Sequence, residues 1–113
     1  MSIDGSGKTT YALKLNQRPM AYALHQNYPN PFNPATIIRF DLPEQAVVSL
    51  KVFNLLGQEV ATPVRNEQME EGYHSAQFDA RNLPSGTYFY RLATTTENGG
   101  KVFQSVKKMV FLK

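Results

Sequence analysis

The chain has 113 residues and a formal net charge of +3, with 12 Lys and Arg residues against 9 Asp and Glu residues. This length gives room for one ordinary domain. The positive charge is modest and gathers toward the C-terminus, with no run of basic residues long enough for an arm that binds nucleic acid. Cysteine is absent, which excludes a disulfide framework, a thiolate nucleophile and a cysteine-based zinc site.

Residues 1–23 differ in pattern from the rest of the chain. The stretch "IDGSGKTTYALKL" predicts a hairpin turn and then a strand in which Tyr11, Leu13 and Leu15 alternate with polar residues, and "NQRPMAYA" predicts a linker. This segment resembles the last hairpin of the same chain, so we expect residues 1–23 to be the end of a preceding, similar domain plus a linker. An incidental tail is the alternative.

The motif "GSGKTT" invites comparison with a loop that binds phosphate. Such a loop needs a glycine five residues before Gly7, a buried strand before it and a helix after it. Position 2 is serine, and the residues that follow alternate like a strand and stop at Pro19. We therefore expect a glycine- and serine-rich turn without nucleotide binding.

Residues 27–34, "NYPNPFNP", predict a stiff and extended segment. Each proline fixes its own φ, removes an N–H and pushes the preceding residue out of the helical region. Tyr28 and Phe32 are expected to anchor this segment on the structure that follows it. A rigid interdomain linker is one interpretation of such a stretch.

Two strands with strict alternation are expected next. Residues 36–42 and 46–54 place apolar side chains at every second position, which is typical of half-buried strands. A turn at residues 54–57 follows, in which Gly57 supplies a positive φ. A short strand at residues 58–62 is expected to stop at Pro63, with a loop or a weak helical turn at residues 65–71.

Three further strands are predicted, at residues 72–80, 87–96 and 101–113. Turn residues separate them, namely "NLPSG" before the second and "ENGG" before the third. Six strands at short spacing and no helix of normal length favour an all-β, antiparallel β-sandwich. The residues expected in its core are Val48, Leu50, Val52, Phe78, Tyr88 and Tyr90.

No pattern in the sequence indicates catalysis, a cofactor or a metal site. Asp41, Glu44 and Glu59 are expected on outward faces or in turns, and His25 and His74 lie far apart. No stretch approaches the 18 apolar residues of a transmembrane helix. The N-terminus lacks the basic and then apolar pattern of a secretory signal peptide, so we expect the chain to be a piece of a longer protein.

Several stretches of the chain together resemble a known family. They are "QNYPNPFNP", "NLLGQEV", "LPSGTYFYR" and the terminal "KKMVFLK", which lie between residues 24 and 113. This combination closely resembles the type A C-terminal sorting domain of the type IX (Por) secretion system of Bacteroidota and their relatives. The resemblance implies an immunoglobulin-like β-sandwich at residues 24–113, and Tyr88 fits the tyrosine that pins a corner in such sandwiches. A plain core tyrosine is the alternative for Tyr88.

The resemblance implies a non-catalytic domain that directs a larger cargo protein to the cell surface or the medium. The expected route runs through the periplasm and the outer membrane. The implied partners are the outer-membrane type IX translocon, sortase-like components and cargo domains on the N-terminal side of the same chain. Cleavage is implied just before the domain, within residues 18–25.

The resemblance also implies the residues that the translocon recognises. The corner motif carries three of them and the terminal strand the others: Pro84, Gly86, Tyr88, Lys107, Lys108, Met109, Val110, Phe111, Leu112 and Lys113. A terminal edge strand would offer unpaired main-chain groups for strand addition, and its lysines would add electrostatic attraction. Pro63 and the charged stretch before Gly72 depart from the family pattern.

Two other functions remain open from the sequence. The first is an accessory immunoglobulin-like module that binds carbohydrate or a surface, for which Phe53, Tyr73 and Phe89 are candidate exposed aromatic residues. The second is a structural domain related to flagellar hook-capping proteins. The second function leaves the "NPFNP" stretch and the terminal "FLK" without an explanation.

Overall fold

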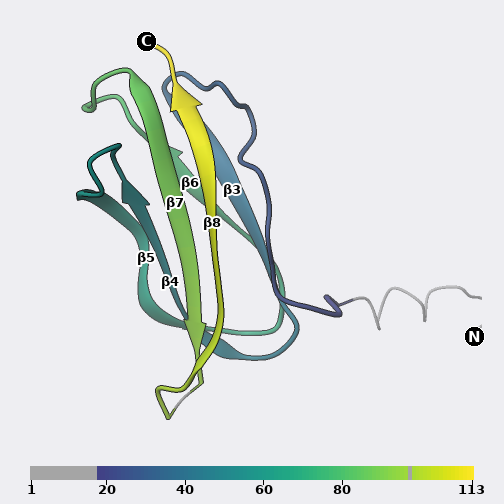
Figure 1. Cartoon of the computed structure of the whole chain (residues 1–113). Helices are drawn as coiled ribbons and strands as arrows, with labels where there is room; N and C mark the ends of the chain where they lie inside the picture. Colours follow the sequence, from purple (N-terminus) through teal and green to yellow (C-terminus); the bar gives the residue numbers. More distant parts are fainter. Residues whose placement is uncertain (1–17, 97) are drawn as a thin grey trace, which may run out of the picture.

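The computed structural model describes residues 18–96 and 98–113. This part of the chain contains no helix and seven strands (Figure 1). They are β2 (Ala23–Leu24), β3 (Ala35–Leu42), β4 (Ala46–Phe53), β5 (Glu59–Met69), β6 (Gly72–Asp79), β7 (Gly86–Thr95) and β8 (Lys101–Phe111). The all-β prediction is therefore confirmed. The hairpin, strand and "GSGKTT" turn expected within residues 3–15 lie outside the described residues.

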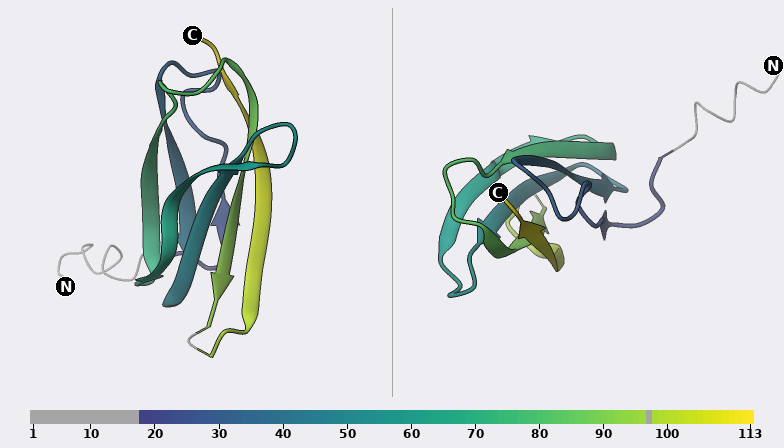
Figure 2. Two further views of the ribbon diagram at one scale, coloured as in Figure 1. Left: turned by 90° about the vertical axis from the view of Figure 1, so that its left-hand side faces the viewer. Right: turned by 90° about the horizontal axis from the view of Figure 1, so that it is seen from above.

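The strands form two antiparallel sheets that pack face to face. One sheet has the strand order β2-β3-β6, and the other has the order β5-β4-β7-β8. Figure 2 shows these two layers from the side and from above. Stacked sheets whose inner faces carry the apolar residues are the expected solution for such a chain, and the predicted antiparallel β-sandwich is confirmed.

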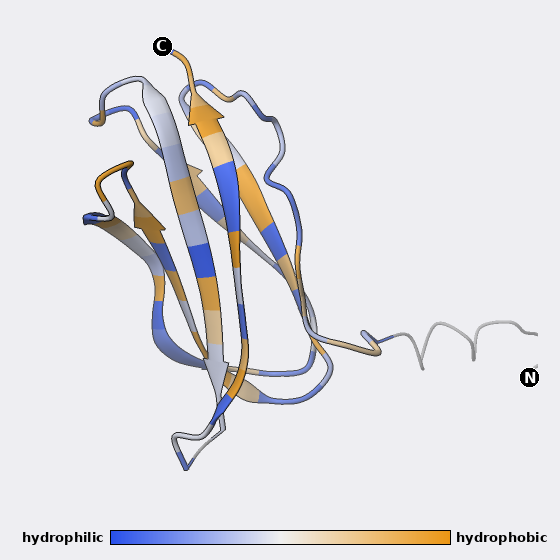
Figure 3. Ribbon diagram, in the orientation of Figure 1, coloured by the Kyte–Doolittle hydropathy of each residue, from blue (hydrophilic) through white to orange (hydrophobic). Residues whose placement is uncertain are grey.

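The inner faces of the two sheets share one hydrophobic core. Figure 3 shows the alternation of apolar and polar residues along several strands as orange and blue bands. Each residue predicted for the core is at most 5% exposed: Val48, Leu50, Val52, Phe78, Tyr88 and Tyr90. The predicted faces of β4, β6 and β7 are therefore confirmed.

β5 corrects the expectation for residues 58–71. Instead of stopping at Pro63 and giving way to a loop or helical turn, β5 continues to Met69. It is an edge strand, and a proline is tolerated there because its missing N–H need not remove a ladder hydrogen bond. Shifts in register with β4, and a φ of +45° at Asn66, interrupt the two-residue pattern that would have revealed the strand.

The proline- and asparagine-rich segment is part of the sandwich, so the linker interpretation is wrong for residues 27–34. Phe32 is 2% exposed, and its ring stacks on that of Phe111 with centroids 5.2 Å apart. Tyr28 is 71% exposed, so only one of the two expected side-chain anchors is buried. The main chain of Tyr28 nonetheless exchanges two hydrogen bonds with that of Ile37. The three Xaa–Pro peptide bonds of this segment are cis.

Candidate functional site: the edge of β8 and the corner before β7

The two motifs that predicted the site meet at one end of the sandwich. β7 and β8 pair so that Gly86 lies opposite Phe111 and Tyr88 lies opposite Met109. The main-chain N–H of Lys113 also donates to the hydroxyl of Ser85 at 2.9 Å. The corner before β7 and the end of the chain therefore form one continuous region.

The corner is held by Tyr88 and Gly86. Tyr88 is 4% exposed, and its hydroxyl donates to the carbonyl of Pro84 at 2.6 Å. This bond back to the main chain, four residues upstream, is the arrangement expected of a tyrosine that pins a corner. Gly86 has a φ of +154°, which residues with a Cβ rarely adopt. The corner is therefore a rigid support for the end of β8.

The predicted site residues of the terminal strand divide between the core and the surface. Met109 and Phe111 are 0% exposed and belong to the hydrophobic core. Lys108, Leu112 and Lys113 are exposed, whereas the remaining two, Lys107 and Val110, are half-buried. A partner can therefore contact the lysines and Leu112 of the folded domain, but not the side chains of Met109 and Phe111.

Residues 26–32, which we call the strap, cover the C-terminal part of the β8 edge. The N–H of Phe32 donates to the carbonyl of Val110 at 3.0 Å, and the N–H of Leu112 donates to the carbonyl of Phe32 at 3.1 Å. The N–H of Val110 donates to Oδ1 of Asn30 at 2.9 Å, and Nε2 of Gln26 donates to the carbonyl of Lys108 at 2.7 Å. We call residues 108–112 the closed half of the edge.

Asn27 and Tyr90 fix the strap to the core. The main-chain N–H of Asn27 donates to the hydroxyl of Tyr90 at 2.8 Å, and this hydroxyl donates to the carbonyl of His25 at 2.7 Å. The side-chain amide of Asn27 donates to the carbonyl of Pro29 and to the hydroxyl of Thr36. Burial raises the pKa of the Tyr90 hydroxyl to about 12.

The strap was missed as part of the site because its partners are distant in sequence. Gln26 and Lys108 are 82 residues apart, and no local pattern predicts such a contact. The available signal was Phe32, a large apolar residue inside a segment that otherwise predicts turns.

Residues 103–107, which we call the open half, form the rest of this edge. Alternate residues of a strand turn their main-chain N–H and C=O groups away from the neighbouring strand. Lys108 and Val110 turn theirs toward the strap, so Gln104 and Val106 turn theirs in the same direction. Within the described residues these groups have no main-chain partner. β2 lies beside β8, and the Tyr22 ring before it stacks on Phe103, but the main chain of β2 is bonded to β3.

Positive charge is concentrated on β8 and the end of the chain. Residues 101–113 include four lysines and no acidic residue, and Arg91 lies on the adjacent strand β7. Lys51 on β4 is the neighbour of Arg91 across the sheet, and it is paired with Glu59 at 3.6 Å. The lysines of β8 make no ion pair with any described acidic residue, so they are available to an anionic partner.

A shallow apolar groove of about 330 Å³ lies beside the open half. Its lining includes Phe53, Phe89, Arg91 and Val106 from the outer face of the four-stranded sheet. The guanidinium carbon of Arg91 lies 4.8 Å from the centroid of the Phe53 ring and covers that ring. The third candidate aromatic residue, Tyr73, lies on β6 in the other sheet, so the structure does not unite the three.

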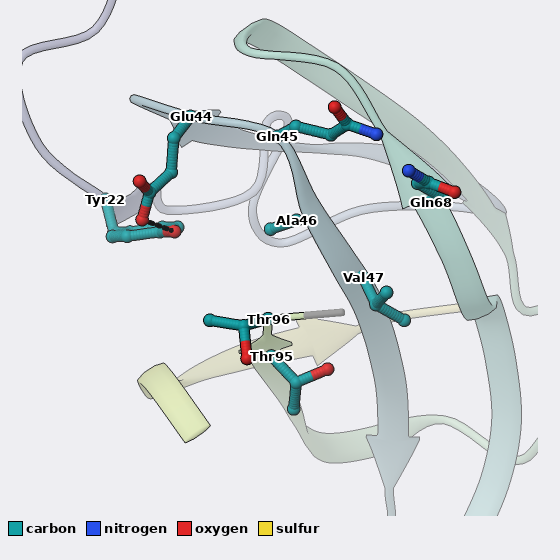
Figure 4. Close-up of a pocket in the computed structure, with 8 residues that line it drawn as sticks. All are labelled: Tyr22, Glu44, Gln45, Ala46, Val47, Gln68, Thr95 and Thr96. Carbon is teal, nitrogen blue, oxygen red and sulfur yellow. Dashed lines mark hydrogen bonds between the residues drawn. The ribbon is translucent and has the colours of Figure 1, made fainter. Parts of the chain in front are cut away.

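A second pocket, of about 150 Å³, lies at the opposite end of β7 from the corner. Figure 4 shows its lining residues, Tyr22, Glu44, Gln45, Ala46, Val47, Gln68, Thr95 and Thr96. The hydroxyl of Tyr22 donates to the Glu44 carboxylate at 2.8 Å. Burial and this carboxylate raise the pKa of Tyr22 to about 12, so the hydroxyl is protonated at neutral pH and is a poor general base.

Other kinds of site have no support within the described part of the chain. The described residues contain no group of His, Asp and Glu side chains that could hold a metal ion. They also contain no helix that is long and apolar enough to cross a membrane. The edge of β8 and the corner before β7 are therefore the best candidate for a functional surface.

Comparison with known proteins identifies one family and one similar fold. A family model described as "Secretion system C-terminal sorting domain" matches residues 26–110, a range that includes the strap, the corner and nearly all of β8. A search of curated proteins finds no match. The crystal structure of CopC from Methylosinus trichosporium OB3b is similar, with a TM-score of 0.51 and 14% identity over 80% of this chain and 93% of that chain. At this identity the likeness shows the fold alone.

Proposed function

The chain belongs to the C-terminal sorting domains of the type IX secretion system, and from this premise we propose how it acts. Residues 24–113 are the address of a larger cargo protein that precedes them in the parent chain. The translocon in the outer membrane recognises this address after the chain has crossed the periplasm, and the cargo reaches the cell surface or the medium. The domain itself performs no catalysis.

The observation that supports this proposal most is the character of β8. Lys108 and Lys113 are exposed at the end of an edge strand, beside the rigid corner of Tyr88. Exposed charges of one sign steer a partner of opposite charge and add specificity. The corner and the closed half hold these charges in a fixed arrangement. We propose that the translocon recognises this arrangement of lysines beside the corner.

We further propose that a sortase-like component cleaves the chain on the N-terminal side of β2. The implied cleavage range, residues 18–25, is not uniform in exposure. Met20 is 97% exposed, whereas Leu24 is 6% exposed and pairs with Phe40 of β3. A protease binds an unpaired, extended chain, so the bonds near Met20 are the accessible ones. Cleavage there leaves the sandwich intact.

An export assay tests the proposal. Residues 24–113 are fused to the C-terminus of a reporter that carries an N-terminal signal peptide, in a host with the type IX apparatus. The fusion should reach the cell surface or the medium. A variant with Lys107, Lys108 and Lys113 changed to Glu should stay in the periplasm, because reversed charge opposes the encounter.

A matched variant controls for net charge and for folding. Changing Arg39, Arg65 and Arg81 to Glu alters the net charge equally, at exposed positions outside β8. This control should be exported like the parent fusion. Circular dichroism and thermal unfolding should show that both variants are folded. Unchanged export of a folded lysine variant would contradict the role of the lysines, and retention of the parent fusion would contradict the sorting function.

Charge reversal is a better test than truncation. Deleting residues 108–113 would remove Met109 and Phe111 from the core, together with the strand that the strap binds. Loss of export would then follow from unfolding of the domain and would not test recognition. The carbohydrate-binding alternative has little support, because Arg91 covers the Phe53 ring that would stack on a sugar.

A further inference from the structure

The open half of the β8 edge has the features of a site for an additional strand. Gln104 and Val106 direct unpaired main-chain donors and acceptors away from β7, and such groups are best satisfied by an extended chain. Val106 is 53% exposed, and Val102, next to the open half, is 40% exposed. Exposed valines on an unpaired edge are usually avoided in proteins without a partner.

The other three edges of the two sheets are less suited to this role. β2 has only two residues. β5 carries Pro63, shifts in register and Asn66 at a positive φ, and each of these features discourages pairing along an edge. β6 is a regular edge strand, but it contains no Lys or Arg and ends at Asp79. β8 is therefore the edge strand in the described structure that joins unpaired main-chain groups to uncompensated positive charge.

A second copy of this chain is a poor occupant. Antiparallel pairing of two β8 strands about Gln104 would place Lys101 of each copy opposite Lys107 of the other. Like charges that lie directly opposite each other destabilise a pair of strands. Acidic side chains at the same places would be attracted instead.

We propose that the open half accepts an extended, acidic segment of a partner protein as a fifth strand of the β5-β4-β7-β8 sheet. This inference rests on the proposed function, because it names the chemistry by which a translocon component would bind the same strand. Acidic side chains of the added strand would lie beside Lys107 on the inner side. Its apolar side chains would lie beside Val106 and the groove on the outer side.

The strap limits where this strand can add. It occupies the edge from Lys108 to Leu112, so an incoming segment has only the main-chain groups of the open half to pair with. Strand addition would therefore involve residues before position 108. Lys108 and Lys113 would contribute only their charges, from beside the end of the added strand.

A binding experiment with the full 113-residue chain tests the proposal. The probe is the peptide acetyl-EVEVTVE-amide, in which valine alternates with glutamate or threonine, and the control is acetyl-KVKVTVK-amide. At an acidic peptide concentration about ten times its Kd, hydrogen exchange of the Gln104 and Val106 amides should slow about tenfold. The lysine peptide should bind at least tenfold more weakly, as expected if a favourable interaction of about 1.4 kcal/mol is lost.

Two further comparisons separate strand addition from simple charge attraction. Gln104→Pro removes an outward N–H and should abolish binding, whereas Gln104→Ala keeps that N–H and should retain binding. If Gln104→Pro does not fold, N-methylated peptides give the same information. An added strand turns the N–H groups of only one alternate set of its residues toward β8, either the valines or the glutamates. Methylation of that set must abolish binding, and methylation of the other set must leave binding unchanged.

The outcomes are distinct from those of the export assay. Protection of β5 or β6 amides instead of Gln104 and Val106, equal binding of the lysine peptide, or no binding overturns the inference. The sorting function stands in each of these cases if export of the fusion still depends on the domain. If the fusion is not exported at all, the sorting function fails, whatever the peptide shows.

Discussion

The two halves of the β8 edge belong to the same strand and pair with the same neighbour, yet they differ in exposure to a partner. The closed half, residues 108–112, is bonded to the strap, whereas the open half, residues 103–107, has no strand beside it in its own sheet. The cause is the path of the N-terminal segment. It pairs with β3 at Leu24, and the Tyr22 ring before it stacks on Phe103 of β8, but its hydrogen bonds to β8 begin only at Gln26. The main-chain groups of the closed half are therefore bonded, and those of the open half are not.

The largest loss of stability is expected when the strap loses its apolar contact with the closed half. Phe32→Ala removes a ring that is 2% exposed and that contacts Phe111 and Phe78. Loss of this side chain should lower the free energy of unfolding by about 3–5 kcal/mol. Chemical denaturation measures this change. Tyr28→Ala, at a position 71% exposed in the same segment, should change stability by less than about 0.5 kcal/mol. Equal losses in the two variants would show that the strap is not anchored by Phe32.

A smaller effect is expected when the strap loses its polar anchor. Tyr90→Phe leaves the N–H of Asn27 and the carbonyl of His25 without their partner, and should cost about 1–3 kcal/mol at neutral pH. Exchange of the Val110 and Leu112 amides in the closed half should accelerate more than that of Gln104 in the open half. Equal acceleration would contradict a specific role in the strap.

The pH dependence of the same variant sharpens this test. The folded protein holds the pKa of Tyr90 at about 12, above the ordinary value of 10.0, so folding favours the neutral hydroxyl. The stability from this shift is fully present below pH 10 and is lost as the pH rises through about 12. The difference in stability between the parent protein and Tyr90→Phe should therefore narrow across this range. A constant difference would show that Tyr90 does not titrate with unfolding.

The corner should contribute less than either strap contact. Tyr88→Phe removes one hydrogen bond, from the hydroxyl to the carbonyl of Pro84, and keeps the buried ring. The expected loss is about 0.5–1.5 kcal/mol. Urea unfolding of the variant gives the value. No measurable loss would mean that the ring alone accounts for the role of Tyr88, as in the plain core alternative.

The smallest effect is expected in the open half. Gln104→Ala changes an exposed side chain and should alter stability by no more than about 0.5 kcal/mol. The midpoint of thermal unfolding should stay close to that of the parent protein. A large loss would show that the open half already has a structural role, and it would remove the contrast between the two halves.

The elements that the sequence predicted well are those whose signal is local. Val48, Leu50 and Val52 alternate within one strand, and the faces of β3, β4 and β7 follow from this period. The continuation of β5 past Pro63 was missed, because the tolerance of an edge for proline depends on a neighbour that the local pattern does not reveal. The bonds between the strap and β8 were not predicted, because they also depend on partners that are distant in the sequence.

The candidate site was predictable only as a set of residues. The resemblance placed Tyr88 and the terminal lysines in it, and the pairing of β7 with β8 brings these residues together. Which side chains a partner can reach depends on burial, so the positions of Met109 and Phe111 in the core required the structure. The division of the edge into two halves required the strap.

The parallel contact between Phe32 and Phe111 also has a mechanical consequence. A pull on the cargo side of the strap, against a grip on the end of the chain, loads the strap and the end of β8 in shear. The bonds at Val110 and Leu112 then share the force and must rupture together, unlike those of a hairpin whose two ends are pulled apart, which break one after another. Tension between the two ends of the domain is therefore carried by the pairing of β2 with β3 and then by the strap, and the rest of the sandwich stays folded while these few bonds hold.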